Sequence, residues 1–161
     1  MIEVRRDDPN NPALAGLIAA HVAEQHGAVP PGFAFALDAR GLSDPAVTFW
    51  SAWDGERVVG MGALKELDTT AGEVKSMRAD AADRGKGVGH AVLSAIVAEA
   101  RARGYARLSL ETGTTPAYDA ALALYRRAGF VACDAFADYR PSPHNQFLTL
   151  ALQETRCPSS S

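Results

Sequence analysis

The stretch GEVKSMRADAADRGKGVGHAVLSAIVAEARARG, residues 72–104, decides the fold. Its first part, residues 73–79, follows the turn-forming sequence Asp-Thr-Thr-Ala-Gly and predicts a short strand. From Val88 onward, apolar residues recur at intervals of three and four, which predicts a helix. Gly104 can end that helix in a left-handed conformation. The stretch therefore predicts a strand, a glycine-rich loop and a helix in succession.

The loop, Arg-Gly-Lys-Gly-Val-Gly at residues 84–89, has the properties of an anion site. Unpaired N–H groups and the helix dipole favour negative charge at a helix N-terminus, and Arg84 and Lys86 add positive charge. The P-loop pattern GxxxxGK[ST] is absent, and a dinucleotide fingerprint starting at Gly85 would place His90 at its third glycine. The spacing instead fits RxxGxG.

At a strand–helix junction, RxxGxG resembles the acyl-CoA pyrophosphate loop of the GNAT superfamily of N-acetyltransferases. A second stretch, Leu-Tyr-Arg-Arg-Ala-Gly-Phe at residues 124–130, matches the LYxxxGF signature that follows the second βα unit of that family. The resemblance covers most of the chain and is strongest over residues 73–130. The phrases KELD, GEVKSMR and LSLETG resemble one bacterial subgroup of these acetyltransferases.

The expected fold class is α/β (α+β), with one GNAT domain over residues 1–154 and a disordered C-terminal tail over residues 155–161. The resemblance implies a mixed, mostly antiparallel central sheet of six to seven strands, about four helices, and central strands that splay at the acyl-CoA site. Asn11-Pro12 and Thr115-Pro116 predict two helix starts. Residues 33–42 fit either a short helix or irregular structure. Local patterns predict strands at residues 2–4, 47–53, 58–67, 73–79, 108–112, 130–133 and 146–152.

Composition narrows the class of protein. The chain of 161 residues is 47% hydrophobic and 22% charged, which is ordinary for one globular domain. A net charge of −3 argues against a nucleic-acid partner, and no apolar run approaches the ~20 residues of a membrane span. The N-terminus lacks a signal-peptide pattern, so we expect a cytoplasmic protein. Cys133 and Cys157 have no metal-binding neighbours, so no metal is expected.

The resemblance implies acetyl-CoA as cosubstrate. The strand before the loop would pair with the pantetheine amides through Met77 and Ala79, and the loop would hold the pyrophosphate. The family usually writes NxxAxxLY in the later helix, but Tyr118 stands at the Asn position here. That puts one cofactor contact in doubt. The expected cofactor-binding residues are Met77, Ala79, Arg84, Gly85, Lys86, Gly87, Val88, Gly89 and Tyr118.

Two residues are expected to carry the chemistry. By resemblance, Tyr125 protonates the departing CoA thiolate, although its helical spacing alone also fits a core tyrosine. Glu73 lies where some GNAT enzymes keep a catalytic glutamate, and apolar neighbours would raise its pKa as a general base requires. Alternatively, Glu73 pairs with Lys75 at a solvent-facing edge. Glu111 is the second candidate for the base.

The leading hypothesis is direct transfer of an acetyl group from acetyl-CoA to a primary amine of a small molecule or peptide. The alternatives are a GNAT-fold module that binds acyl-CoA without turnover, and a nucleotide-binding protein that uses the same loop. His21 fits either a packed histidine or the border of the acceptor pocket. The acidic balance weakly favours a basic amine, and exposed strand edges make a homodimer plausible.

Overall fold

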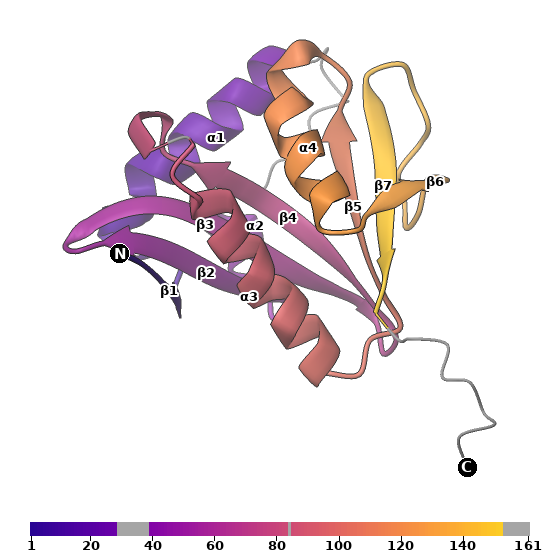
Figure 1. Cartoon of the computed structure of the whole chain (residues 1–161), viewed down its shortest axis with the longest axis horizontal. Helices are drawn as coiled ribbons and strands as arrows, with labels where there is room; N and C mark the ends of the chain where they lie inside the picture. The colour runs from indigo at the N-terminus through magenta and orange to yellow at the C-terminus, as the bar shows by residue number, and fades with distance from the viewer. Residues whose placement is uncertain (29–38, 84, 153–161) are drawn as a thin grey trace.

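The computed structural model describes residues 1–28, 39–83 and 85–152. In this part of the chain, one seven-stranded sheet has the order β1-β2-β3-β4-β5-β7-β6, and helices lie on both of its faces (Figure 1). The strands are β1 (Ile2–Arg6), β2 (Val47–Asp54), β3 (Arg57–Asp68), β4 (Ala71–Ala79), β5 (Arg107–Gly113), β6 (Val131–Cys133) and β7 (Asn145–Ala151). The helices are α1 (Ala15–Ala28), α2 (Ala39–Leu42), α3 (Val88–Ala102) and α4 (Asp119–Arg127), with 3-10 turns at Pro12–Leu14, Ala81–Asp83 and Pro116–Tyr118.

The sheet is mostly antiparallel, as the sequence predicted. Strands β1 to β4 form an antiparallel meander, and β5, β7 and β6 form a second antiparallel group. The two groups meet through the parallel pair β4 and β5, which α3 connects. The predicted strand–loop–helix–strand unit is therefore confirmed, and it joins the two halves of the sheet.

Two predicted glycine caps end the helices that cover the site. Gly104, after α3, has φ 79° and Gly129, after α4, has φ 104°. In each case the next residue donates its N–H to the carbonyl five positions back: Tyr105 to Ala100 at 3.1 Å, and Phe130 to Tyr125 at 3.0 Å. These are the bonds of a Schellman motif.

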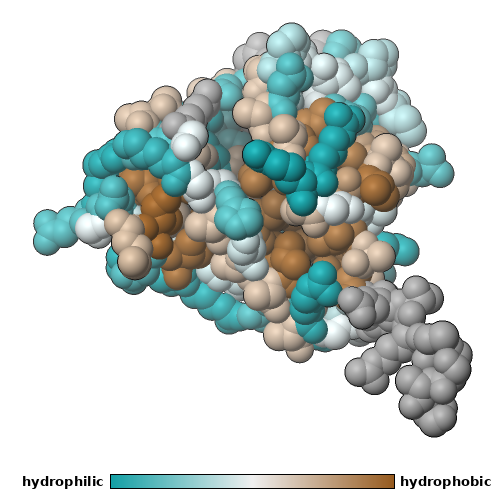
Figure 2. Space-filling model, viewed as in Figure 1, coloured by the Kyte–Doolittle hydropathy of each residue, from teal (hydrophilic) through white to brown (hydrophobic). Residues whose placement is uncertain are grey.

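Two apolar cores lie on opposite faces of the sheet, because successive strand residues point to opposite sides. The face under α3 and α4 is packed with residues such as Leu64, Val92 and Ile96. The face under α1 and α2 holds a smaller cluster around Leu17, Phe49 and Met61. Figure 2 views the first of these faces, where hydrophobic residues show between the helices and hydrophilic residues cover their outer sides.

A β-bulge interrupts β4 at Ser76, the second half of the strand being displaced by one residue against β3. Ser76 has φ 58°, a left-handed conformation that a non-glycine residue rarely adopts. The bulge changes which residues face α3: Val74 and Met77 both pack on that core although they are three positions apart. Same-face residues of a regular strand are an even number apart. Glu73, Lys75 and Arg78 consequently lie on the face of α1.

Several sequence predictions need correction or fall outside the described residues. Helix α1 continues through Gly27 to Ala28, where the prolines and glycines of residues 27–32 predicted a loop or break from Gly27. Thr115 makes no side-chain cap, and a 3-10 turn precedes α4. Of the candidate helix at residues 33–42, α2 takes the last four residues, and residues 33–38 lie outside the described part. Arg84 and the tail at residues 155–161 also lie outside it.

Gly62 tests the packing of α3 on the sheet. A Cβ there would lie 2.6 Å from Val92 Cγ1 and 2.8 Å from Met77 Sδ. We expect Gly62→Ala to lower the free energy of unfolding by about 1–3 kcal/mol, as overpacked cores do. The control is Gly16→Ala in α1, where nothing lies within 4 Å and a stabilisation of about 0.5–1 kcal/mol is expected. Urea denaturation measures both, and a Gly62→Ala protein as stable as the parent would contradict the packing.

Candidate active site

A gap opens between the two central strands. The parallel ladder of β4 and β5 has four residue pairs and ends at Val74 and Leu110. Strand β4 continues to Ala79 along β3, and β5 continues to Gly113 along β7, with no further pairing between them. Met77 and Ala79 lie on the part of β4 that borders this gap. Backbone groups on the open edge can pair with an extended ligand as they would with another strand.

The glycine-rich loop follows the open end of β4 after the 3-10 turn at Ala81–Asp83. Gly85 and Gly87 have φ 83° and 84°, and open space lies where a Cβ would point. Gly87 is the N-cap of α3 and supplies no side-chain cap, so the N–H groups of the first turn, from Val88 and Gly89 on, face outward. Gly89 has a different role: a Cβ there would meet Leu124 of α4 at 2.9 Å.

An ion pair between the half-exposed Arg57 and the buried Asp83 holds the loop to the sheet. Both carboxylate oxygens of Asp83 accept hydrogen bonds from the guanidinium of Arg57 on β3, with 2.7 Å between Nη1 and Oδ2. These bonds lower the pKa of Asp83 below its usual value. Lys86 Nζ lies 3.4 Å from Asp83 Oδ1, and its side chain is largely exposed. The ammonium can therefore turn from Asp83 to an incoming phosphate.

Glu73 does not lie among apolar neighbours, and it does not lie at a solvent-facing edge. Its side chain is 3% exposed and that of Lys75 is 9% exposed, with 3.4 Å between Lys75 Nζ and Glu73 Oε2. The hydroxyl of Tyr139 donates to the same oxygen, and Lys75 Nζ donates to that hydroxyl at 2.8 Å. The sequence predicted the pairing with Lys75 as an alternative, but β4 is a central strand, so the pair is buried.

Glu111 lies beside this cluster on β5. Burial raises its pKa to about 7; the charge of Glu73 also raises it, while Lys75 and a hydrogen bond with Asn145 lower it. Asn145 is buried and braces the β6–β7 loop, with Nδ2 donating to the carbonyl of Arg140 at 3.2 Å. Two carboxylates from neighbouring strands thus share one polar site next to the gap, and a carboxyl group with a pKa near 7 suits a general base.

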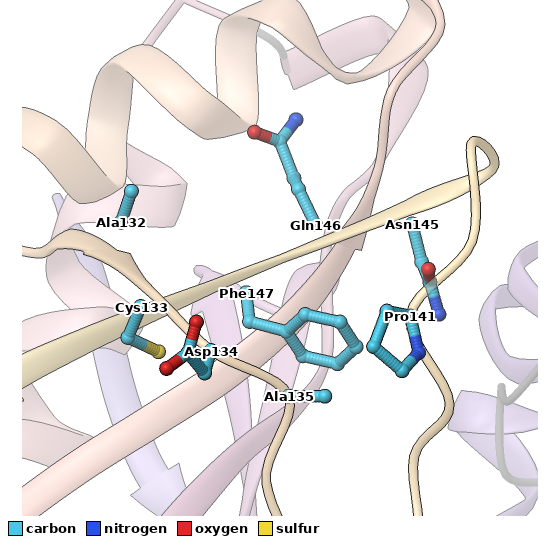
Figure 3. A pocket seen from close by; sticks show the side chains of 8 residues that line it. All are labelled: Ala132, Cys133, Asp134, Ala135, Pro141, Asn145, Gln146 and Phe147. Atoms are coloured by element: carbon cyan, nitrogen blue, oxygen red, sulfur yellow. The ribbon is translucent and has the colours of Figure 1, made fainter.

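Aromatic side chains from the β6–β7 loop and from β7 lie beside this site. The rings of Phe136, Tyr139 and Phe147 pack with centroids 5.2–5.8 Å apart. Close by is a cavity of about 440 Å³, with Phe147, Pro141 and Asn145 on one side and Cys133 and Asp134 on the other (Figure 3). The loop therefore provides both an apolar wall and the hydroxyl that bonds Glu73.

Tyr125 lies on the other face of the sheet, in the core beneath α4, where Met77 and Ala79 also pack. It is buried, its ring lies 5.8 Å from that of Phe130, and burial raises the pKa of its phenol. Tyr118, at the N-cap of α4, packs its ring over Gly113 at the end of β5, where a Cβ would collide with it. The ring of Tyr118 thus covers Gly113, the last residue of β5, beyond the end of the β4–β5 ladder.

A second charged group lies under α1. Arg78 Nη1 donates to Glu24 Oε2 at 2.9 Å, and the Arg78 side chain is 12% exposed. His21 is buried, and burial together with the charge of Arg78 lowers its pKa to about 4. The imidazole is therefore neutral at neutral pH. Its environment on α1 agrees with a packed histidine that borders the charged face of β4.

The structure brings Glu73 and Glu111 together and places the loop at the end of β4, but it separates Tyr125 from the carboxylates by the thickness of the sheet. Sequence reasoning missed Tyr139, Asn145 and the Arg57–Asp83 pair. The available signal was two aromatic residues, Phe136 and Tyr139, in the stretch before Pro141. Among the described residues there is no cluster suited to a metal ion and no helix long and apolar enough to cross a membrane.

Comparison with known proteins agrees with this architecture. Residues 14–130 match the model of the acetyltransferase (GNAT) family. The chain is 44% identical over 154 residues to YedL of Escherichia coli, named an uncharacterized N-acetyltransferase, covering 96% of this chain and 97% of that protein. It shares 30% identity and a TM-score of 0.77 with a candidate acyl-CoA N-acyltransferase of Klebsiella pneumoniae, covering 95% and 99% of the two chains.

A further solved structure shares the fold. It is yncA of Salmonella typhimurium with its cofactor acetyl-CoA, which is 18% identical with a TM-score of 0.71 and covers 98% of this chain and 97% of that one. The expected fold is confirmed: a mixed seven-stranded sheet with four helices. The chain belongs to the acetyltransferase (GNAT) family, and it is an N-acetyltransferase.

Proposed function

We propose that the protein transfers the acetyl group directly from acetyl-CoA to a primary amine of a small molecule or peptide, with both substrates bound at once. The observation that carries this proposal is the end of the β4–β5 ladder at Val74 and Leu110. The gap gives the donor an open strand edge, and the carboxylates on the α1 face give an amine a site beside it. Holding two reactants in this way is itself a large part of catalysis.

The chain has suitable groups for each part of the donor. The open edge at Met77 and Ala79 pairs with the pantetheine amides, and one of their N–H groups faces the thioester oxygen. The helix start at residues 85–89 holds the pyrophosphate, with Lys86 and Arg84 adding charge. Tyr118, whose ring closes the end of β5, contacts the pantetheine arm in place of the usual Asn.

Protons are handled on the two faces of the sheet separately. On the α1 face, the pair Glu73 and Glu111 takes the proton that the attacking amine loses. The pKa of Glu111 is about 7, which suits a general base at neutral pH. Burial raises this pKa most, and the negative charge of Glu73 raises it further. On the α3 face, Tyr125 gives a proton to the departing thiolate of CoA. Its raised pKa keeps the phenol protonated before that step.

Release of free CoA thiol in the presence of a panel of amines tests this transfer, because a module that binds acyl-CoA without turnover releases none. A cytoplasmic location and a homodimer stay predictions.

Gly87→Glu should abolish acetyl-CoA binding, because a charged side chain enters a site for pyrophosphate. The matched control is Gly55→Glu in the β2–β3 turn. Gly55 also has positive φ and open space around it, so backbone strain and added charge are similar. We expect acetyl-CoA at 100 times Kd to stabilise the parent and the control by about 2.7 kcal/mol, but not Gly87→Glu. Equal thermal protection of all three would remove the loop from the donor site.

Tyr125→Phe should lower kcat by about 10²–10⁴-fold with little change in stability, as loss of a general acid does. The control is Tyr105→Phe, whose hydroxyl donates to Glu66 Oε1 at 2.7 Å in a structural contact. That variant should lose stability and keep its kcat. Steady-state kinetics with an acceptor for which chemistry limits the rate tests both, and an unchanged kcat in Tyr125→Phe would return this residue to a packing role.

The rate should fall below about pH 7, because a base acts only when it is deprotonated and the pKa of Glu111 is about 7. Glu111→Gln should remove this acidic limb of kcat/KM. Glu73→Gln removes a charge that raises the pKa of Glu111, so the limb should move to lower pH while the rate falls at least about tenfold. Amines of different pKa separate this limb from titration of the acceptor. An acidic limb that survives Glu111→Gln at the same pH would rule out the carboxylate pair.

A further inference from the structure

Arg78 carries a charge that acetyl transfer to a plain amine does not use. It follows Met77 on β4 and points to the α1 face, the same face as Glu73 and Lys75. Of its nitrogens, Nη1 bonds Glu24. Its Nε is buried and has no hydrogen-bond acceptor among the described residues. Leaving such a donor without a partner costs about 1–3 kcal/mol, and more for a charged group, so a buried guanidinium needs a second acceptor.

The geometry of the guanidinium identifies the acceptor that fits. The group is planar, and Nη1 lies on the side of Cδ, while Nε–H and Nη2 point along a common edge on the other side. Glu24 therefore leaves the Nε–Nη2 edge to another group. Two parallel N–H donors match the two oxygens of a carboxylate, which is the strongest and most specific pairing of arginine.

A second buried polar group on the same strand also has no partner. Ser76 Oγ is buried and makes no hydrogen bond within the described part of the chain. Ser76 forms the bulge at which β4 leaves β5, two positions before Arg78. These two buried side chains without partners lie two positions apart on the part of β4 that borders the gap, which points to a ligand with oxygen atoms there.

The charges on this face are arranged in two groups. Arg78, paired with the half-exposed Glu24 of α1, is the cation at one end, and the neighbouring His21 is neutral. The carboxylates of Glu73 and Glu111 lie at the other end, beside the last paired residues. Lys75 and Arg78 are three positions apart, so their Cα atoms are about 10 Å apart at the usual strand rise. The long side chain of Arg78 covers part of that distance. A molecule with both an ammonium and a carboxylate complements this arrangement.

We propose that the acceptor is an amino acid, whose carboxylate binds the Nε edge of Arg78 while its amine faces Glu73 and Glu111. Ser76 Oγ donates to the same carboxylate. The rings of Tyr139 and Phe136 face the remainder of the acceptor. This inference rests on the proposed function and adds to it the class of substrate.

A matched panel of acceptors tests the proposal. It holds the standard L-amino acids, their amides, and the amines left when the carboxylate is removed, with release of CoA thiol as readout. For the preferred amino acid, kcat/KM should exceed that of its amide and of its decarboxylated amine at least tenfold. Amides or simple amines that are acetylated as well as the acids would overturn the inference while leaving the acetyltransferase function intact. A higher kcat/KM for the aminophosphonate analogue than for the amino acid would also overturn the inference, because the site would then prefer a phosphonate to a carboxylate.

Variants locate the effect. Arg78→Gln should reduce the acid-to-amide ratio of kcat/KM at least tenfold, mainly through KM, and Arg78→Lys should restore part of it. The control Arg5→Gln, on β1 at the edge of the sheet, should keep the ratio. A ratio unchanged in Arg78→Gln would contradict the assignment. Thermal protection by acetyl-CoA shows whether each variant is folded.

A binding measurement keeps the two proposals distinguishable. With CoA present, the preferred amino acid should protect the parent from thermal unfolding, and its amide should not. This difference should be lost in Arg78→Gln. Protection without any release of CoA thiol would support the carboxylate site and contradict the proposed transfer. Absence of protection by every amino acid in the panel would contradict the carboxylate site.

Discussion

The parallel hydrogen-bond ladder between β4 and β5 ends at Val74 and Leu110, and the other features of the site depend on this ending. Both strands stay paired on their outer sides, which holds them in place while a row of backbone groups on the inner side loses its partner. Unpaired backbone groups inside a sheet are costly unless a ligand or water satisfies them. The bulge at Ser76 turns the strand at that place and sets which side chains face each side of the gap.

The two faces of the gap differ in chemistry. The α3 face is apolar and contains Tyr125, whose phenol is kept protonated by burial. The α1 face is polar and contains Glu73, Lys75 and Glu111, held by Tyr139 from a loop that closes over them. Acetyl transfer needs a base that takes a proton from the amine and an acid that gives a proton to the thiolate. Because the sheet lies between these groups, no proton passes directly from the acid to the base.

Glycine serves the donor side in two separate ways. Gly85 and Gly87 adopt positive φ, which lets the loop turn so that the first N–H groups of α3 point outward. Gly89 has an ordinary conformation and instead leaves room for Leu124 of α4. The same short pattern thus shapes an anion site and fixes the packing of the two helices that flank it. The glycines allow the conformation of the loop, and the Arg57–Asp83 pair fixes the position of the loop on β3.

Local signals in the sequence determined the strand–loop–helix unit, the caps at Gly104 and Gly129, the hairpins and the paired motifs that indicate the family, because each depends on residues a few positions apart. The seven strand segments followed from them, but the order of the last three strands in the sheet, β5-β7-β6, did not. Only the tertiary structure decided the surroundings of Glu73, because its partner Tyr139 lies 66 positions away. The same holds for Asp83 with Arg57, and for Arg78 with Glu24. Side chains distant in sequence meet only when the sheet and the loops have packed together. Burial at these contacts then changes the protonation of the side chains. Periodicity along the chain therefore predicts neither the contacts nor the protonation.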